Sequence, residues 1–420
     1  MASKTLVIVE SPAKCKKIES YLGSEYKVIA SYGHFTKLDS LDQIDFESYH
    51  IKYKVDKHKV LKQLKEEIKK SKEVIIATDD DREGESIGWA ICTFCKLNPN
   101  TTKKMVFQEI TKKALPNALN NIVHINMDMV KSQQCRQILD IYLGYKISPM
   151  LWKHIQHKLS AGRCQTPALK LIYDNEMELR SQDQTTHFVI SSTFTAKNIK
   201  FTGMYPISKN NIDDFLNYQK SKRDWKLNHY KQTESTLTPP KVLITSTLQQ
   251  KASSLLHYSP KMTMSYAQEL YESGLITYMR TDSAIYSKDF AGLLKEHIIN
   301  NYGDNYLMEN ITTRLCVNAN KGKAQEAHEG IRVCDLNNVS PKTKTAQARR
   351  LYDMIYVHSI QCGMANAIVQ NNIYDINSMY KYDDENKVYT FQYNCKKYIF
   401  KGWKIIDTSD ERDEATSVYL

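Results

Sequence analysis

The sequence lacks several features that would assign it to common protein classes. None of its 420 residues belongs to an apolar run approaching the length of a membrane-spanning helix. Its start, Met-Ala-Ser-Lys, leads directly into the strand-like run Leu6–Val9, so we expect no secretory signal peptide. No G-x-x-x-x-G-K-[ST] motif is present, which excludes a P-loop nucleotide site.

A disulfide framework is also not expected. The nine cysteines are an odd number and mostly isolated, which indicates a reducing compartment. Cys92 and Cys95 form a C-x-x-C pair, but one such pair without histidines or a second pair is a weak zinc signal. Packing in the core is therefore the expected role of both cysteines.

Positive charge is in excess, with a formal net charge of +11. A basic balance favours a polyanionic partner, although many proteins with other partners are mildly basic. The chain is too long for one compact core, and its length predicts about two to four domains.

Hydrophobic periodicity divides the chain into mixed, helical and strand-rich regions. Residues 1–125 alternate strands and helices, which predicts a small α/β domain with a parallel sheet. The remaining regions are helical at 126–184, strand-rich at 185–243, helical at 244–340 and 341–365, and strand-rich at 366–420. This order predicts a helical domain inserted between the two halves of a β-rich domain.

Within the α/β region the individual elements can also be predicted. Continuous apolar runs are typical of strands covered on both faces, whereas helical spacing separates apolar residues by three or four positions. The predicted strands are Leu6–Val9, Tyr26–Ser31, Val74–Thr78 and Met105–Phe107, and the predicted helices are Pro12–Gly23, Asp56–Ser71 and a segment beginning at Thr111.

Four carboxylates follow two of these strands. Asp79 and Asp81 lie on the same side by alternation, and Glu83 lies on the turn just after them. Glu10 ends the first strand, so it is expected at the same sheet edge, where open α/β sheets bind ligands. Carboxylates this close repel one another without a cation, and oxygen ligands without His or Cys indicate Mg²⁺. The alternative is an acidic solvated loop, but the position behind the strands favours a metal site.

A lysine is expected near the same edge. Lys14 lies one turn into the helix that follows the first strand, where its cation can meet a phosphate near the helix N-terminus. An ordinary exposed lysine explains this position equally well.

The segment Leu275–Ser283 places a tyrosine and an arginine at alternate positions. It follows a helix-like run with Gly274 as the expected cap, and its β-branched and apolar residues predict an extended strand. Alternation then places Tyr278, Arg280 and Asp282 on one face. An oxygen nucleophile beside a fixed cation is what attack on a phosphodiester requires. Taken alone, such a pair is more often a buried tyrosine beside a surface arginine.

Six short motifs follow one another along the chain. They are Val9–Lys14, Asp79–Glu85, Leu159–Gln165, Ile244–Gln250, Ile276–Ser283 and Ala327–Arg332. In this order they resemble the type IA DNA topoisomerases, and the resemblance covers nearly the whole chain. The residues of the first and fifth motifs are similar to those of the bacterial topoisomerase I branch rather than the topoisomerase III branch. One such motif is a weak signal, whereas six in order are highly specific.

The resemblance implies a multidomain, toroidal architecture. Its expected parts are a Toprim α/β domain at 1–125, the first half of a helical base domain at 126–184, a β-rich arm at 185–243 and 366–420, and a helical gate domain at 244–340 with a helical return at 341–365. Such an enzyme cleaves one DNA strand, passes the other through the gap and reseals the break. It relaxes negative supercoils with Mg²⁺ and without ATP.

The resemblance also implies roles for single residues. Tyr278 matches the nucleophile that forms a 5′-phosphotyrosine bond, and Arg280 matches the arginine that stabilises the phosphate. Glu10 matches the carboxylate that handles the proton of the 3′ leaving oxygen. The remaining matches are Asp79 and Asp81 as the metal-binding pair with Glu83 near them, Lys14 as the active-site lysine, and His328 as a histidine near the cleavage site.

Candidate DNA contacts come from the first domain, the base domain and the gate domain. Arg136 and Asp140 are spaced i, i+4 and so share a helix face, and small residues beside Arg163 permit close approach to a DNA backbone. By composition alone each candidate is more often an ordinary surface residue. The full set is His34, Arg136, Asp140, Lys153, Ser160, Ala161, Gly162, Arg163, Cys164, Gln165 and Arg280.

The chain departs from the family pattern after residue 403. In that pattern the returning arm is followed by a second stretch of base domain, whereas this sequence stops at Leu420. We therefore expect either a fragment or a second polypeptide that supplies the remainder. The alternatives are a DNA-binding subunit of a split enzyme and another Toprim enzyme such as a primase or nuclease, which leaves Thr277–Ser283 unexplained. The expected location is the cytoplasm or nucleoid, with a viral factory also open.

Overall fold

The computed structural model describes residues 4–182, 188–196, 199–207, 212–221, 224–317, 329–379 and 388–406. The chain divides into two compact units, each assembled from three separate stretches of sequence. The first unit comprises Met1–Gln182, Leu243–Ser283 and Asn320–Met354, and the second comprises Asp183–Val242, Ala284–Ala319 and Ile355–Leu420. The four domain ranges expected from the sequence stay a prediction.

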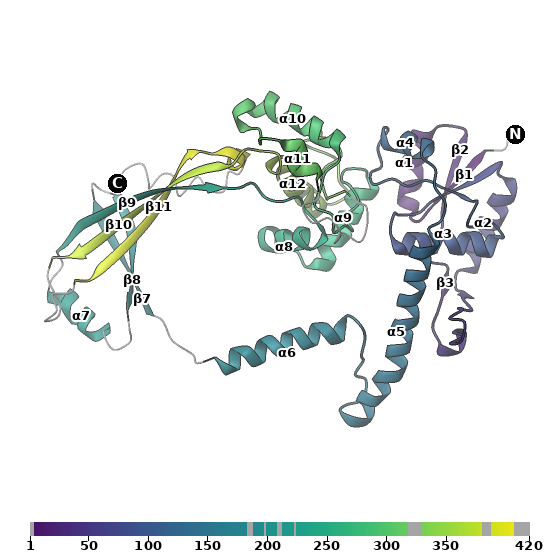
Figure 1. The fold of residues 1–420 in the computed structure, drawn as a ribbon, viewed down its shortest axis with the longest axis horizontal. Helices are drawn as coiled ribbons and strands as arrows, with labels where there is room; N and C mark the ends of the chain where they lie inside the picture. Colours follow the sequence, from purple (N-terminus) through teal and green to yellow (C-terminus); the bar gives the residue numbers. More distant parts are fainter. Residues whose placement is uncertain are drawn as a thin grey trace. The chain divides into compact units, whose positions relative to one another are not determined.

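The first unit is built on a four-stranded parallel sheet with the order β2-β1-β5-β6 (Figure 1). Val9, Ala30 and Ala77 pair across the ends of three neighbouring strands, so the carboxyl ends of these strands align. The parallel α/β sheet predicted from the sequence is confirmed. Its strands are β1 Thr5–Val9, β2 Tyr26–Ala30, β5 Glu73–Ala77 and β6 Lys103–Lys104.

The helices of this α/β region begin where the sequence supplies caps. Ser11 accepts a hydrogen bond from the Ala13 amide at 3.3 Å and Pro12 opens the first helix, as both residue types favour. Asp81 caps the third helix by accepting from the Gly84 amide at 2.7 Å. The helices are α1 Pro12–Leu22, α2 His58–Lys70, α3 Arg82–Cys95 and α4 Ala114–Asn120.

Two of the sequence predictions in this region were wrong or displaced. Met105–Phe107 is not a strand, because β6 comprises Lys103–Lys104 and its last paired residue is Lys104; the Met105 amide bonds to the Ile76 carbonyl at 2.8 Å. The helix expected from Thr111 begins later, at Ala114, whose amide bonds to the Thr111 hydroxyl at 3.1 Å. Cys92 is fully buried in the core of the sheet, as predicted.

Helical structure continues through the expected base region. The helices are α5 Met127–His154 and α6 Gln165–Ser181, and a small hairpin of β3 Thr36–Lys37 and β4 Lys54–Val55 lies earlier in the chain beside the 3-10 turn Leu41–Gln43. Among the helices that the structure describes, none is long and apolar enough to cross a membrane.

The segment around the tyrosine follows two helices, α8 Thr245–Leu256 and α9 Pro260–Glu272. Gly274 adopts a left-handed φ of +60° just past α9, as expected of a helix-ending glycine. The extended strand predicted at Leu275–Arg280 was wrong, since only the isolated bridge Ile276–Val333 forms. After that bridge the Tyr278 amide bonds to the Gln108 carbonyl at 2.9 Å, so no ladder continues.

The second unit contains a five-stranded antiparallel sheet with the order β7-β8-β11-β10-β9. The two strand-rich stretches of the sequence thus share one sheet, whose long strands β9, β10 and β11 are seen in Figure 1. Phe215 and Phe391 are fully buried in its aromatic core. The strands are β7 Phe188–Ala196, β8 Ile199–Ile207, β9 Trp225–Leu237, β10 Ala367–Ser378 and β11 Thr390–Phe400.

The helical elements of the later chain complete the described structure. They are α7 Ile212–Ser221, α10 Lys288–Tyr302, α11 Ile311–Cys316 and α12 Ala346–Gln361, with 3-10 turns at Asp304–Tyr306 and Gly402–Ile406. Helix α7 lies inside the strand-rich stretch, where the sequence analysis expected no helix.

Candidate active site

The phenol of Tyr278 lies against the acidic loop of the α/β domain. Its hydroxyl donates a hydrogen bond of 2.6 Å to Oδ2 of Asp81, and the residue is only 3% exposed. The guanidinium of Arg280 approaches the same carboxylate oxygen, with Nη1 at 3.6 Å. The tyrosine and arginine that the sequence paired therefore converge on one predicted metal-site carboxylate, although their backbone is not a strand.

The acidic loop itself is held by short contacts within the α/β domain. Lys14 forms an ion pair with Asp79, and both side chains are nearly fully buried. The other oxygen of Asp81 caps α3, as described above. A Cβ atom at Gly84 would stand 2.1 Å from the Asp79 carbonyl, so the close approach of helix and loop requires glycine there.

The clustered carboxylates change the protonation of their neighbours. Burial, reinforced by Asp79 and Asp81, raises the pKa of Glu10 to about 7, although Lys14 and Arg280 oppose the shift. Burial likewise raises the pKa of the Asp79 carboxyl despite its ion pair with Lys14. Burial is thus the main cause of both pKa shifts, and the neighbouring carboxylates add to it.

Tyr278 is affected in the same direction. Its burial, together with the charges of Asp79 and Asp81, raises the pKa of the phenol far above its ordinary value. A phenol in this state is a poor nucleophile until a base takes its proton or a cation changes the field. Asp81 is the carboxylate in place to accept that proton.

The donor chemistry at this edge fits a hard divalent cation. In the parts of the chain that the structure describes, no three His, Cys, Asp or Glu side chains are grouped as a metal site. Asp79 instead pairs with Lys14, and Asp81 accepts from the Tyr278 hydroxyl. A set of oxygen-only donors nevertheless matches the preference of Mg²⁺.

Comparison with known proteins identifies the family. A model of the family described as DNA topoisomerase matches residues 124–419, and one described as Toprim domain matches residues 5–110. The chain is 36% identical over 435 residues to DNA topoisomerase 1 of Campylobacter jejuni, covering 98% of this chain and 61% of that protein. The chain belongs to the type IA DNA topoisomerase family.

A solved structure agrees with this assignment. Full-length topoisomerase I from Thermotoga maritima matches with a TM-score of 0.77 and 30% sequence identity, covering 96% of this chain and 68% of that one. The bacterial-type resemblance and the Toprim fold predicted from the sequence are thereby confirmed. The chain spans about 61% of the length of its curated Campylobacter relative.

Glu83, the fourth carboxylate expected near the metal, has other partners in this topoisomerase-family chain. Its Oε2 lies 3.0 Å from Nε2 of His34 and accepts a 3.0 Å bond from the Gln133 amide. Arg136 approaches the same side chain at 3.6 Å. His34 and Arg136, both predicted DNA contacts, are thus gathered around Glu83, and these contacts lower the pKa of its carboxyl.

Apart from Arg280, the other predicted DNA contacts lie on α5, in the loop that follows it, or at the start of α6. Nε of Arg163 is 2.7 Å from the Asp140 carboxylate. The Gln165 amide donates to the Ser160 hydroxyl at 3.0 Å, and the Ala161 amide donates to Ser148. The exposed members of the set include Lys153 and Cys164, and Gly162 lies between these contacts. His328 lies outside the described residues.

The sequence analysis missed the residues that hold the tyrosine segment against the Toprim domain. Arg332 is 4% exposed and pairs with Glu329 at 2.5 Å and with Glu109 at 3.1 Å. Gln108 bonds to the Tyr278 amide through its carbonyl and to the Glu329 amide through its side chain, at 3.1 Å. Arg332 was within a recognised motif, but nothing in the local pattern at Gln108 or Glu109 signalled a partner more than 200 positions away.

Proposed function

We propose that this chain catalyses DNA strand cleavage and rejoining through Tyr278. The observation that carries the proposal is the convergence of the Tyr278 hydroxyl and the Arg280 guanidinium on Asp81, beside a buried acidic cluster. The arrangement supplies a nucleophile, a proton acceptor and a cation for the phosphate within a few ångströms.

The proposed reaction is a transesterification. The phenolic oxygen of Tyr278 attacks the phosphorus and forms a 5′-phosphotyrosine, while its proton passes to Asp81. The bond from phosphorus to the 3′ oxygen breaks, and Glu10 donates a proton to that leaving oxygen. A carboxyl with a pKa of about 7 is suited to this role because it holds a proton near neutral pH. Religation is the same step in reverse.

Arg280 and Lys14 are proposed to manage charge during the reaction. Arg280 is partly exposed, so its guanidinium can turn from Asp81 towards an incoming phosphate. The Lys14 ammonium pairs with Asp79 and lies 4.7 Å from the ring centroid of Tyr271, and these two contacts position the lysine side chain. Both cations would stabilise the transition state in which phosphate charge increases.

We propose Mg²⁺ as the cofactor, held by Asp79 and Asp81 with Glu10 and Glu83 beside them. When bound, the ion would neutralise the carboxylates and polarise the phosphate. The ion would compete with the present contacts of these side chains, which are Asp79 with Lys14, Asp81 with the Tyr278 hydroxyl, and Glu83 with His34. These four carboxylates are the ligands expected from the sequence.

The substrate proposed is a single-stranded segment of negatively supercoiled DNA. The DNA contacts are His34, Arg136, Asp140, Lys153, Arg163 and the loop Ser160–Gln165. Passing the intact strand through the break relaxes supercoils, and storing the phosphodiester on tyrosine removes the need for ATP. The place of action is the DNA-containing compartment, the nucleoid or a viral factory.

Plasmid relaxation tests this function directly. The chain should relax negatively supercoiled plasmid with Mg²⁺ and without ATP, and Tyr278→Phe should abolish both relaxation and 5′-linked DNA on single-stranded oligonucleotides. Tyr266→Phe, on the neighbouring helix α9, is the matched control and should behave as the parent chain. Failure of the parent chain to accumulate covalent 5′-linked DNA would exclude the proposed reaction for this chain alone.

A second candidate is a DNA-binding subunit of a split topoisomerase. It is favoured by the burial of Tyr278, because a phenol whose pKa is raised far above its ordinary value is a poor nucleophile. This candidate predicts DNA binding without adduct formation, and recovery of the adduct when a second polypeptide with the remaining region is added. A neighbouring reading frame that encodes such a region would support it.

A further inference from the structure

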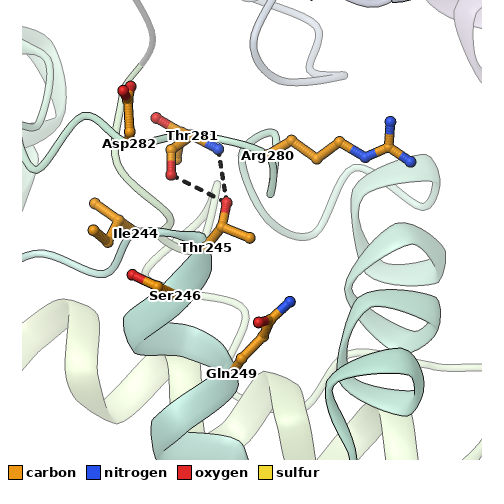
Figure 2. Close-up of a pocket in the computed structure, with 7 residues that line it drawn as sticks. All are labelled: Ile244, Thr245, Ser246, Gln249, Arg280, Thr281 and Asp282. Atoms are coloured by element: carbon orange, nitrogen blue, oxygen red, sulfur yellow. Dashed lines mark hydrogen bonds between the residues drawn. The ribbon is translucent and has the colours of Figure 1, made fainter. Parts of the chain in front are cut away.

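A cavity of about 400 Å³ opens beside the tyrosine segment (Figure 2). Its volume lies within the range of roughly 300–1,000 Å³ typical of small-ligand sites. The residues that line it are Ile244, Thr245, Ser246, Gln249, Arg280, Thr281 and Asp282. All seven come from the stretch 244–282, which also carries Tyr278, so the cavity belongs to the same piece of protein as the nucleophile.

The wall of the cavity is bonded to the backbone on both sides of Arg280. The Thr245 hydroxyl donates to the Met279 carbonyl at 2.8 Å and accepts from the Thr281 amide at 2.9 Å. Figure 2 shows Thr245 below Thr281, with the Arg280 side chain extending away from the other lining residues. Arg280 therefore connects the cavity with the candidate active site, since its guanidinium also approaches Asp81, which accepts from the Tyr278 hydroxyl.

We propose that this cavity holds the first nucleotide of the DNA end that becomes attached to Tyr278. The inference rests on the proposed function, in which that nucleotide carries the 5′ phosphate of the phosphotyrosine. The 3′ end leaves on the Toprim side, beside Glu10, whereas the 5′ end stays with the tyrosine. A site built only from the tyrosine's own segment can retain the 5′ end while the two sides separate.

The lining matches one nucleotide in chemistry as well as size. Ile244 offers an apolar surface to a base or sugar, and the Gln249 amide both donates and accepts hydrogen bonds to a base edge. The Asp282 carboxylate can accept from an exocyclic amino group, and Arg280 is placed for the 5′ phosphate. The site would take any of several bases, because a single amide and carboxylate discriminate only partly.

A binding experiment tests the cavity without requiring catalysis. The probe is a 3′-labelled trinucleotide of deoxycytidine with a 5′ phosphate, bound to the Tyr278→Phe chain and followed by fluorescence polarisation. Removing the first base, by an abasic sugar at that position, should weaken binding about 3–10-fold, the equivalent of one or two hydrogen bonds. Gln249→Ala should cause a similar loss and should make the abasic change nearly neutral.

Gln250→Ala is the matched control, because Gln250 is the next residue of α8 and does not line the cavity. It should bind every probe as the parent chain does. The proposal is overturned if Gln249→Ala binds like Gln250→Ala, or if the abasic penalty is the same in both variants. A probe that is abasic only at its third position should bind as the intact one.

Adduct formation by the parent chain separates this inference from the function on which it rests. If the probes behave as expected but no adduct forms, the cavity is a nucleotide site and the proposed reaction is wrong for this chain. If adducts form but Gln249→Ala matches Gln250→Ala in binding and in religation rate, the reaction stands and the cavity assignment is wrong.

Discussion

The acidic side and the nucleophile side of the active site are held in place by different means. Asp79 and Asp81 follow a buried strand of the parallel sheet, and Asp81 caps a helix. Tyr278 instead lies in a segment without a ladder. Its amide bonds to the Gln108 carbonyl, and the Thr245 hydroxyl bonds to the backbone of Met279 and Thr281. One side is thus built on a paired sheet, whereas the other, although buried, is held by individual hydrogen bonds. The proposed reaction, which parts two ends of DNA, would use such a difference.

The strongest test of the acidic side is Glu10→Gln. If Glu10 gives its proton to the leaving oxygen, removing the proton should slow single-turnover cleavage by about 10²–10⁴-fold, the usual contribution of general acid catalysis. DNA binding should be unchanged, since the amide keeps the shape. Glu25→Gln, at an exposed position, is the control. A cleavage rate within twofold of the parent chain would remove Glu10 from the reaction.

The contacts that attach the nucleophile side are tested by Arg332→Gln. This change leaves Glu329 and Glu109 without their buried cation, so we expect a loss of about 3 kcal/mol in the free energy of unfolding. Urea unfolding measures it. Arg180→Gln removes only an exposed pair with Glu176 and should cost less than about 1 kcal/mol. Equal effects of the two changes would show that the Arg332 pairs do not anchor the segment.

The raised pKa of Glu10 also predicts a pH dependence of stability in the absence of divalent cations. Because the pKa is raised from 4.5 to about 7 on folding, the folded state binds the proton more tightly than the unfolded chain. Stability from this group is therefore complete below pH 4.5 and is lost as pH rises through about 7. The loss should be at most about 3 kcal/mol, reduced by solvent screening. Urea unfolding in EDTA should show it in the parent chain and less in Glu10→Gln.

The smallest expected effect is at Thr245, whose hydroxyl bridges Met279 and Thr281. Thr245→Val removes the hydroxyl at similar volume and should lower the cleavage rate roughly tenfold, in line with one or two lost hydrogen bonds. The loss should appear in kcat rather than KM, because Tyr278 would be misplaced rather than DNA released. Thr245→Ser keeps the hydroxyl and should restore the rate. A Ser variant as slow as the Val variant would contradict a positioning role.

Much of the Toprim domain was predictable because its signals are local. Continuous apolar runs predicted β1, β2 and β5, and the alternation behind β5 predicted that acidic side chains gather at one sheet edge. The tyrosine segment was harder. Its β-branched residues favoured a strand, but no partner strand continues beyond the bridge at Ile276, and propensity cannot supply one.

The sequence by itself determined the family and the sheet of the Toprim domain, and it predicted the residue types of the candidate active site. It did so because motifs and short periodicities involve residues that lie close together in the sequence. Only the tertiary structure decided that Tyr278 bonds to Asp81, that Glu83 turns to His34, and that Arg332 pairs with Glu109. These contacts join residues from about 50 to more than 200 positions apart. Their formation depends on how segments that are distant in the sequence pack together, which no local pattern encodes.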